Sequence, residues 1–351
     1  MKYNKTVVIL TPGFPADEED TTCLTFLQDY VISFSRLYPD IKLFIVSFQY
    51  PFVCKHYSWN GVDVFSAGGR NRKYFFKLLT WIRVVKEVFR IRKISNEIVF
   101  HSLWLTECTL VAQWISGIFK IKHIAYIIGQ DATVSNKYLR LLNFYKIHLV
   151  AMSPMLADNI FRLTKCQVNN IIPLGVDPYK AVISTKVRDM DVIGVGSLTS
   201  LKNYSLFVDI IGELKTDFRD IKSCLIGKGP EREKILLKIQ EKNLTHHLQL
   251  VGEVSHLEVF EWMQKSKILL HTSEYEGQST VMMEALSAGL HIVCFNVGRF
   301  HSEGRITVCE NKEQMTKALK RLLLNHELPF EPLILQTMDD TVKSFARLYG
   351  I

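Results

Sequence analysis

Short apolar segments alternate with longer amphipathic segments along the whole chain. In the first half, the apolar runs predict strands at residues 6–10, 41–48, 97–104, 123–131 and 148–153. The segments between them predict helices at residues 22–37 and 70–94 and from Pro154 onward. In the second half, strands are predicted at residues 191–198, 221–229, 248–254, 268–273 and 291–298, alternating with helices at residues 204–214, 231–243, 256–266 and 280–289 and from Glu313 onward. This alternation predicts an α/β fold with two parallel sheets flanked by helices.

A domain boundary is expected in the segment IIPLGVDP, residues 171–178, where a short apolar run breaks into proline and glycine. The strand–helix alternation starts again after it. We therefore predict two Rossmann-like domains, residues 1–172 and 173–351, and we allow the last helix to pack back on the N-terminal domain. Ligands of such sheets bind beyond the carboxyl ends of the strands, so the loops that follow strands hold the candidate chemistry.

The loop and helix after the predicted strand 268–273 contain two acidic residues eight positions apart. Glu276 lies in the loop and Glu284 about a turn inside the helix, which places the carboxylates on the order of 7–10 Å apart. The backbone N–H groups at the start of this helix form an anion site, at Gln278, Ser279 and Thr280. Two carboxylates beside an anion site suit a sugar–diphosphate–ribose ligand, because carboxylates accept hydrogen bonds from hydroxyl groups and the amides hold phosphate.

Lys202 supplies the positive charge that a diphosphate needs. It follows a glycine loop (Gly194, Gly196) at the end of a predicted strand, where its ammonium would neutralise a leaving diphosphate. The alternative is a capped helix with an exposed glutamate and a surface lysine, which is the usual state of a single lysine. The combination of the loop, both glutamates and the glycine spacing favours the ligand site.

These motifs resemble those of the family 4 retaining glycosyltransferases, which have the GT-B fold. The span from Glu276 to Glu284 resembles the family's E-x(7)-E signature. Four further segments resemble family motifs in order and spacing: TPGFP (11–15), IIPLGVD (171–177), VGSLTSLKN (195–203) and LIGKGPEREKI (225–235). The resemblance covers nearly the whole chain.

The resemblance implies an acceptor-binding N-terminal domain and a C-terminal domain that binds a nucleotide sugar. The sugar would pass, with retention, to a hydroxyl of a glycan or lipid-linked saccharide, without metal or cofactor. Glu276 and Lys202 would be the catalytic residues, meeting the donor sugar and the diphosphate, and Glu284 would meet the ribose. Further donor-binding candidates are Gly13, which would approach the diphosphate from the other domain, Val254 near the base, and Gly196, Ser197, Gly277, Gln278, Ser279 and Thr280.

Two positions depart from the family pattern. Ser197 stands where the family usually has arginine, and Ile128 stands where it often has a histidine that contacts the donor sugar. The polar candidates left to face the acceptor or the sugar are His101, Gln130 and Asp131, although a lone histidine after a strand also fits a structural role. The departures motivate an alternative, a non-catalytic sugar-nucleotide-binding subunit of a transferase complex. A sugar-nucleotide 2-epimerase is a second alternative.

Residues 70–94 carry nine basic residues against one acidic residue, in a chain whose net charge is +8. On a helix, basic side chains form one stripe (Arg83, Lys86, Arg90, Lys93) and apolar side chains form another (Phe75, Leu78, Ile82, Val85, Phe89). The helix could dock on anionic lipid head groups near a lipid-linked acceptor. Alternatively, its apolar stripe could face the core with a solvated basic back. Nucleic acid is not an expected partner, because no recognised binding module is present.

The expected compartment is the cytoplasm, with a peripheral position on the inner face of the cell membrane as the membrane-docked alternative. The seven cysteines are scattered and form no C-x-x-C pair, which indicates a reducing environment and no zinc site. The apolar run near the N-terminus is too short for a signal-peptide core. No apolar stretch reaches the length of about 20 residues that spans a bilayer.

Overall fold

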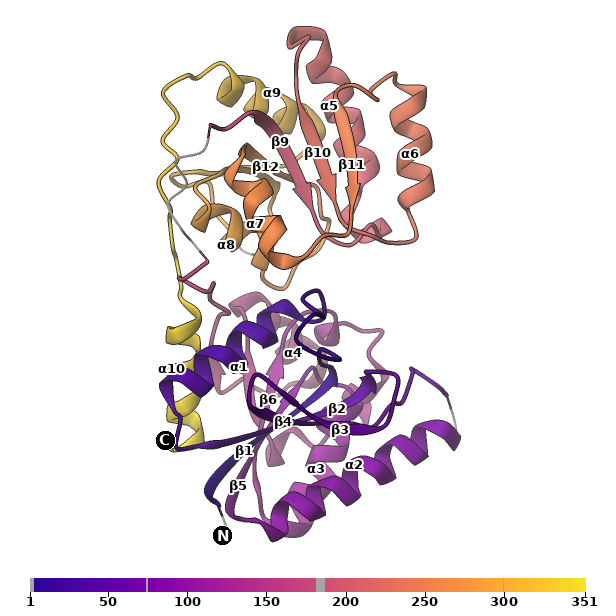
Figure 1. The fold of residues 1–351 in the computed structure, drawn as a ribbon, viewed down its shortest axis with the longest axis vertical. Helices are drawn as coiled ribbons and strands as arrows, with labels where there is room; N and C mark the ends of the chain where they lie inside the picture. Colours follow the sequence, from indigo (N-terminus) through magenta and orange to yellow (C-terminus); the bar gives the residue numbers. More distant parts are fainter. Residues whose placement is uncertain (1–2, 74, 181–186, 299) are drawn as a thin grey trace. The chain divides into compact units, whose positions relative to one another are not determined.

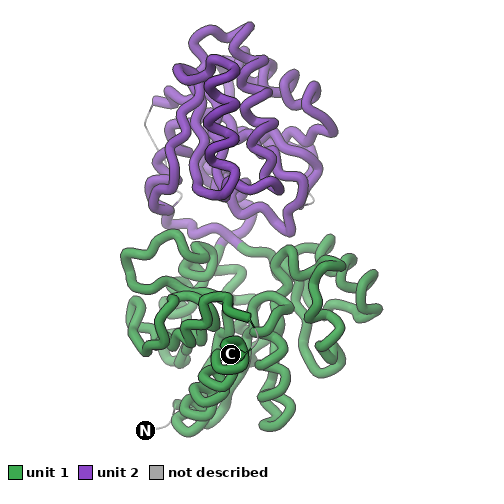
Figure 2. The backbone as a smooth tube through the Cα atoms, turned by 90° about the vertical axis from the view of Figure 1, so that its right-hand side faces the viewer, with its two compact units in different colours: residues 1–174, 338–351 green, residues 175–337 purple. Residues whose placement is uncertain are grey.

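The computed structural model describes residues 3–73, 75–180, 187–298 and 300–351 (Figure 1). The chain divides into two compact units (Figure 2). Unit 1 comprises residues 1–174 and 338–351, and unit 2 comprises residues 175–337. Each unit has its own largely parallel sheet, so the predicted α/β class with two parallel sheets is confirmed.

Unit 1 contains an eight-stranded sheet in the order β3-β4-β2-β1-β5-β6-β7-β8. The strands are β1 (Tyr3–Gly13), β2 (Lys42–Tyr50), β3 (Lys55–Trp59), β4 (Val62–Ser66), β5 (Ser95–Leu103), β6 (Lys122–Ile127), β7 (His148–Ala151) and β8 (Asn170–Ile171). The edge strand β3 pairs antiparallel with β4, and the other pairs are parallel. The carboxyl ends of the parallel strands therefore share one edge of the sheet.

Helices cover both faces of this sheet. Successive residues of a strand point to opposite faces, so alternate residues of β1 belong to two different cores. Val7 and Ile9 of β1 belong to a core shared with three helices, α1 (Thr25–Leu37), α4 (Pro154–Thr164) and α10 (Met338–Tyr349). Val8 and Leu10 belong to the opposite core, shared with α2 (Phe75–Lys93) and α3 (Glu107–Phe119). Three short 3-10 turns complete the described helical segments of unit 1: η1 (Gln130–Ala132), η2 (Lys137–Arg140) and η3 (Phe144–Lys146).

The face that α2 buries differs from the apolar stripe read from the sequence. Most of that stripe is solvent-exposed: 66% of Phe75, 51% of Leu78, 42% of Ile82 and 43% of Phe89. The buried residues of α2 are instead Thr80, Val84, Glu87, Val88 and Ile91. The helix does face the core and its basic stripe is exposed, but the face it buries is not the predicted apolar stripe. Apart from Glu87, the buried side chains of α2 are β-branched, while Phe75, Leu78, Ile82 and Phe89 are exposed.

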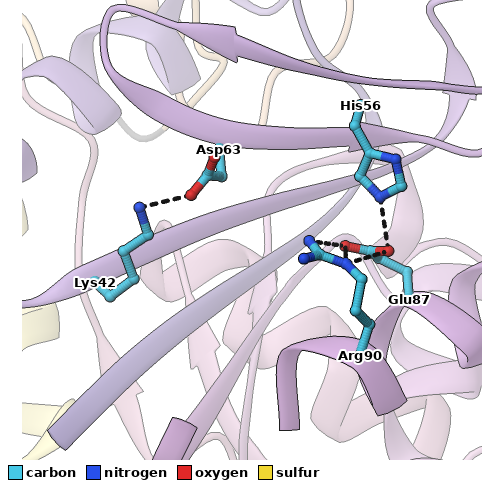
Figure 3. Close-up of polar contacts among 5 residues, drawn as sticks. All are labelled: Lys42, His56, Asp63, Glu87 and Arg90. Carbon is cyan, nitrogen blue, oxygen red and sulfur yellow. Dashed lines mark hydrogen bonds and ion pairs between the residues drawn. The ribbon is translucent and has the colours of Figure 1, made fainter. Parts of the chain in front are cut away.

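Glu87 is the buried charge on α2, and its carboxylate has two partners (Figure 3). Arg90, one turn later, binds it with Nη2 at 2.6 Å, and His56 of β3 binds it with Nε2 at 2.8 Å. Beside this cluster, Lys42 and Asp63 form a separate ion pair at 2.6 Å. Glu87 thus attaches the β3–β4 hairpin to α2.

The last helix, α10, belongs to unit 1. It packs against α1, where the hydroxyl groups of Tyr30 and Tyr349 lie 2.7 Å apart. Phe345 of α10 is fully buried in the same core. The chain therefore returns to its first unit after completing the second.

Unit 2 contains a six-stranded parallel sheet in the order β11-β10-β9-β12-β13-β14. The strands are β9 (Met190–Val195), β10 (Ser223–Ile226), β11 (Leu248–Gly252), β12 (Ser266–His271), β13 (His291–Phe295) and β14 (Ile306–Cys309). One face packs against α5 (Tyr204–Asp217), α6 (Arg232–Glu241) and α9 (Lys312–Leu323). The other packs against α7 (His256–Gln264) and α8 (Thr280–Ser287). A 3-10 turn, η4 (Ser200–Lys202), precedes α5.

Among the described strands and α-helices, β3, β4, α3 and β14 had no counterpart in the sequence prediction. The turn between β3 and β4 is Asn60-Gly61, both with positive φ, which is the usual composition of a tight hairpin turn. Helix α3 is buried around most of its circumference, so it lacks the polar face that marks an amphipathic helix.

Candidate functional site

Two glycine loops lie against each other at the carboxyl edge of the unit 2 sheet, after β9 and β10. Gly196 and Gly227 both have positive φ, +148° and +143°. The N–H of Gly196 donates to the carbonyl of Ile226 at 3.0 Å. A Cβ atom on Gly227 would lie 1.9 Å from the carbonyl oxygen of Gly196, so this position admits only glycine.

Hydrogen bonds tie the loop that carries Lys202 to the loop after β12. The Thr272 hydroxyl donates to the carbonyl of Lys202 at 2.8 Å, and the Asn203 amide donates to the Glu274 carboxylate at 3.0 Å. The N–H of Glu274 donates to the carbonyl of Leu201 at 3.0 Å. Two segments about 70 residues apart in the sequence are thereby held side by side.

Lys202, Glu276 and His271 form one polar cluster at this edge. Lys202 Nζ lies 2.5 Å from Glu276 Oε1, and His271 Nε2 lies 3.3 Å from the same oxygen. Burial by itself would raise the pKa of Glu276, but the His271 hydrogen bond and the Lys202 charge outweigh burial and lower this pKa to about 2. Burial lowers the pKa of His271. Glu276 is therefore a carboxylate beside a neutral imidazole and an ammonium.

His271 was not among the sequence candidates. It ends the apolar run of β12, and a polar residue at the carboxyl end of a buried parallel strand is the signal that could have found it. Its Nε2 also lies 3.2 Å from the Ser279 hydroxyl at the start of α8. Since Ser279 contacts His271, its side chain does not cap the helix. Gly277 is buried, and Gln278 and Thr280 are half-buried in the same turn.

Tyr204 adds a hydroxyl group to the cluster that sequence reasoning did not predict. The ring is buried, and within the described part of the chain its hydroxyl has no hydrogen-bond partner. A Cβ atom on Gly196 would lie 2.8 Å from this hydroxyl, so the hydroxyl lies directly beside the glycine loop. Burial and the Glu276 charge raise the pKa of Tyr204, which leaves it a neutral donor. Ser197, in the same loop, is exposed.

Glu284 lies on α8 and has its own partner. His256 Nε2, at the start of α7, lies 2.8 Å from Glu284 Oε1. Val254, between β11 and α7, is half-buried against the core formed by α7 and α8. The structure thus brings Lys202 into contact with Glu276 but gives Glu284 a separate contact.

Comparison with known proteins shows which family unit 2 resembles. Residues 177–331 match the family model described as glycosyl transferases group 1. These residues, most of unit 2, are thus similar to the group 1 glycosyltransferases. The site described above lies within the matched residues.

Two curated relatives illustrate the family. The first is an N-acetylgalactosamine-N,N'-diacetylbacillosaminyl-diphospho-undecaprenol 4-alpha-N-acetylgalactosaminyltransferase from Campylobacter jejuni, 25% identical over 58% of this chain and 59% of the relative. The second is a 2-deoxystreptamine N-acetyl-D-glucosaminyltransferase from Niallia circulans, 26% identical over 39% of this chain and 36% of the relative. The matches thus span less than two thirds of these relatives.

Solved structures show the same fold over nearly the whole chain. HepE from Anabaena, in complex with UDP and glucose, has a TM-score of 0.70 at 13% identity, covering 99% of this chain and 95% of that one. Sucrose-phosphate synthase from Thermosynechococcus elongatus has a TM-score of 0.73 at 14% identity, covering 99% and 94%. These neighbours support a GT-B-like fold for this chain.

Two sequence candidates in unit 1, His101 and Asp131, are buried and have partners within their own unit. His101 is 2% exposed, stacks on Phe345, and places Nδ1 2.5 Å from the Tyr349 hydroxyl. Burial, with the nearby His123, lowers the pKa of His101 to about 3. Asp131 is also buried, and its carboxylate accepts backbone N–H groups of its own and the neighbouring loop, those of Leu105, Ile128 and Gly129. The core and the loop thus hold these two side chains in place, and their expected contact with the acceptor or the sugar stays a prediction.

Gln130 and Gly13 are the remaining unit 1 candidates. Gln130 is exposed at the start of η1, beyond the carboxyl end of β6. Gly13 ends β1, and a Cβ atom there would lie 3.6 Å from Tyr50 Cβ and 3.7 Å from Cys23 Sγ, ordinary contact distances. Its surroundings in unit 1 do not require glycine, and its expected approach to the diphosphate stays a prediction.

The described residues contain neither a metal cluster nor a membrane-spanning helix. Among them, no group of three His, Cys, Asp or Glu side chains could hold a metal ion. None of the helices in the described ranges is both long enough and apolar enough to cross a bilayer.

Proposed function

We propose that this protein transfers a sugar from a nucleoside-diphosphate sugar to a hydroxyl group of a glycan or lipid-linked saccharide, with retention at the transferred carbon. The observation that carries the proposal is the contact between Lys202 and Glu276 beside the start of α8. An ammonium, a carboxylate and a helix N-terminus in one place match the charges of a sugar diphosphate.

In the proposed mechanism, unit 2 holds the donor and stabilises the leaving diphosphate. The Lys202 ammonium and the start of α8 balance the negative charge that grows on the diphosphate as the glycosidic bond breaks. Glu276 stays ionised and accepts hydrogen bonds from donor-sugar hydroxyls, and Glu284 does the same for the ribose. The Lys202–Glu276 contact is exchanged for contacts with the donor when the donor binds. The Tyr204 hydroxyl is a further donor for a phosphate oxygen.

The names of similar proteins support the classes of donor and acceptor. HepE was solved with UDP and glucose, which supports a UDP-sugar as the first donor to test. The Campylobacter relative is named for transfer to a diphospho-undecaprenol-linked sugar, which supports a lipid-linked acceptor. We accordingly propose unit 1 as the acceptor-binding unit.

The site is tested by removing its charges one at a time. We expect Glu276→Gln and Lys202→Ala each to lower turnover with the true donor by about 10²–10³-fold, the usual loss for a group that stabilises developing charge. Lys234→Ala is the matched control, because Lys234 is an exposed lysine of unit 2 paired with Glu231. Near-wild-type turnover in both site variants would refute the assignment.

Product analysis separates the alternatives. A 2-epimerase would give free UDP or a changed sugar without any acceptor. A non-catalytic subunit, motivated by Ser197 and Ile128, would bind the donor without hydrolysing it. Slow donor hydrolysis by the purified protein without acceptor supports a catalytic site.

We further propose that unit 1 docks on an anionic lipid surface through α2, at the inner face of the cell membrane. The exposed apolar side chains of α2 adjoin those of α3, where Trp81 packs edge-on against Trp114 and Phe89 against Phe119. On α3, Trp114 and Ile118 are exposed as well. Such a surface, beside the basic stripe of α2, suits a bilayer with acidic head groups.

Vesicle flotation tests this surface. Wild-type protein should float with phosphatidylglycerol-containing vesicles and not with pure phosphatidylcholine, and the double variants Ile82→Ser/Phe89→Ser and Lys86→Glu/Lys93→Glu should lose flotation. Leu237→Ser, at an exposed leucine of α6 in unit 2, is the control. Flotation that is unchanged in both double variants contradicts the proposal. If wild-type protein forms dimers and the Ile82→Ser/Phe89→Ser variant does not, the surface instead binds a second copy of this chain.

A further inference from the structure

A chain of three polar side chains in unit 2 ends on Glu284. Lys180 Nζ lies 3.1 Å from His256 Nδ1, and His256 Nε2 lies 2.8 Å from Glu284 Oε1. The side chains of His256 and Glu284 are only 11% and 14% exposed. Water therefore competes weakly for the contact between them.

Three separate segments bring these residues together. His256 is the first residue of α7, whose start is fixed by a capping box between Ser255 and Glu258. Lys180 follows a turn in which the Asp177 carboxylate accepts the N–H of Tyr179 at 3.0 Å. Glu284 comes from the middle of α8. Since each segment has its own local constraint, the relative positions of the three side chains are defined before any ligand binds.

The hydrogen-bond chemistry of the chain defines the state of the histidine. An ammonium group has only donors, so Lys180 donates to a lone pair on Nδ1 of His256. The ring proton of a neutral imidazole must then lie on Nε2, where it is donated to the Glu284 carboxylate. Lys180 thus selects the one neutral tautomer that can bind Glu284.

We infer that Lys180 and His256 are positioning residues that orient Glu284 for the nucleotide. The inference rests on the proposed function, in which Glu284 accepts a ribose hydroxyl. With Oε1 bound by His256, the carboxylate cannot rotate freely, and Oε2 is presented in one direction. An oriented carboxylate loses less conformational freedom when it binds a ribose hydroxyl than a mobile carboxylate does. The hydroxyl therefore adds more to the affinity of the nucleotide, relative to its deoxyribose form.

The first test measures nucleotide binding by calorimetry with UDP and GDP. His256→Phe keeps a ring but removes the donor, and we expect about tenfold weaker binding of the diphosphate that wild type binds, which corresponds to about 1.4 kcal/mol. The preference of this variant for the ribose form of the diphosphate over the 2′- and 3′-deoxyribose forms should shrink as well. His256→Gln restores an N–H donor and should recover most of the affinity. Leu257→Ala, at the exposed next residue, is the control.

The second test reads the histidine directly and needs no ligand. In ¹⁵N-histidine NMR spectra, assigned by loss of the signal in His256→Gln, His256 should carry its proton on Nε2 alone at neutral pH. Lys180→Met should allow the other tautomer. Wild-type affinity in His256→Phe, or a proton on Nδ1 in wild type, overturns the inference. If wild type binds neither nucleotide, the proposed function fails, and the tautomer still decides whether the chain of contacts exists.

Discussion

Gly227 shows how closely the two glycine loops of unit 2 approach each other. The carbonyl oxygen of Gly196 occupies the space that a Cβ atom on Gly227 would need, and the φ of Gly227 lies where other residues are strained. The backbone of one loop is therefore the packing surface of the other. The same edge carries Lys202, so the shape of the loops and the position of the cation are linked.

We expect Gly227→Ala to destabilise unit 2, by about 1–3 kcal/mol from the backbone conformation alone. It should also weaken nucleotide binding, because the loops must separate to admit the methyl group. Gly117→Ala is the control, since Gly117 lies in α3 with no atom within 4 Å of the added Cβ. That change should stabilise unit 1 by about 0.5–1 kcal/mol. Thermal unfolding with and without UDP measures both effects, and an unchanged Gly227→Ala protein would contradict the close approach.

The low pKa of Glu276 predicts a pH dependence of stability. The pKa is about 2 in the folded protein against an ordinary 4.5, so the unfolded chain binds more protons between these values. The stabilisation is fully present above pH 4.5 and is lost as the pH falls toward 2. In urea unfolding from pH 5 to pH 3, the advantage of wild type over Glu276→Gln should therefore shrink. A constant difference over this range would show that the carboxylate is not stabilised in its ionised form.

Helix α2 combines a narrow buried face with large exposed apolar side chains. Its one buried carboxylate, Glu87, binds Arg90 on the same helix and His56 on the neighbouring hairpin. The helix is thus held by compact aliphatic contacts and by one polar cluster, leaving Ile82 and Phe89 to the outside. This division leaves exposed the apolar side chains that the proposed docking surface needs.

Glu87→Gln should destabilise unit 1 by about 1–2 kcal/mol, because hydrogen bonds to a charged group are replaced by weaker ones. Its partners Arg90 and His56 are about half exposed, so water can replace the lost hydrogen bonds to them and the loss of stability stays moderate. Glu97→Gln is the control: Glu97 pairs with Lys5 but is 60% exposed, and we expect a change below about 0.5 kcal/mol. Chemical denaturation compares the two, and equal losses would contradict the role of burial.

The molecule contains two units with separate cores. The chain leaves unit 1 near Leu174, builds unit 2, and returns at Met338 to place α10 against α1. The stability of unit 1 therefore depends on α10 as well as on the strands and helices before Leu174. Because a ligand stabilises the unit that binds it, the two units can be distinguished by their unfolding transitions.

Phe345→Ala tests this organisation. Phe345 is fully buried against His101 and Tyr126, and removing a buried aromatic ring typically costs about 3–5 kcal/mol. We expect the loss in the transition of unit 1 alone, with the transition raised by UDP left unchanged. Calorimetry measures both. A loss in the UDP-sensitive transition would mean that α10 supports unit 2 instead.

Local patterns were sufficient for most elements, because strand and helix periodicities and glycine-rich loops are properties of neighbouring residues. The predicted strand 268–273 and helix 280–289 are observed as β12 and α8, within a few residues. The missed hairpin at Asn60-Gly61 does carry a turn signal in its sequence. Helix α3 has no readable polar face, since its surroundings bury it on most sides.

The sequence by itself determined the α/β class, the parallel sheets and the residue types at the end of β12, since each follows from short-range order. Only the tertiary structure decided which side chains meet. Lys202 contacts Glu276 across 74 positions, and His101 lies in a core completed by a helix 248 positions away. It also decided which face of α2 is buried, namely the one with Val84, Val88 and Ile91 and not the stripe with Ile82 and Phe89. Contacts of this kind depend on how distant segments pack, which no local pattern encodes.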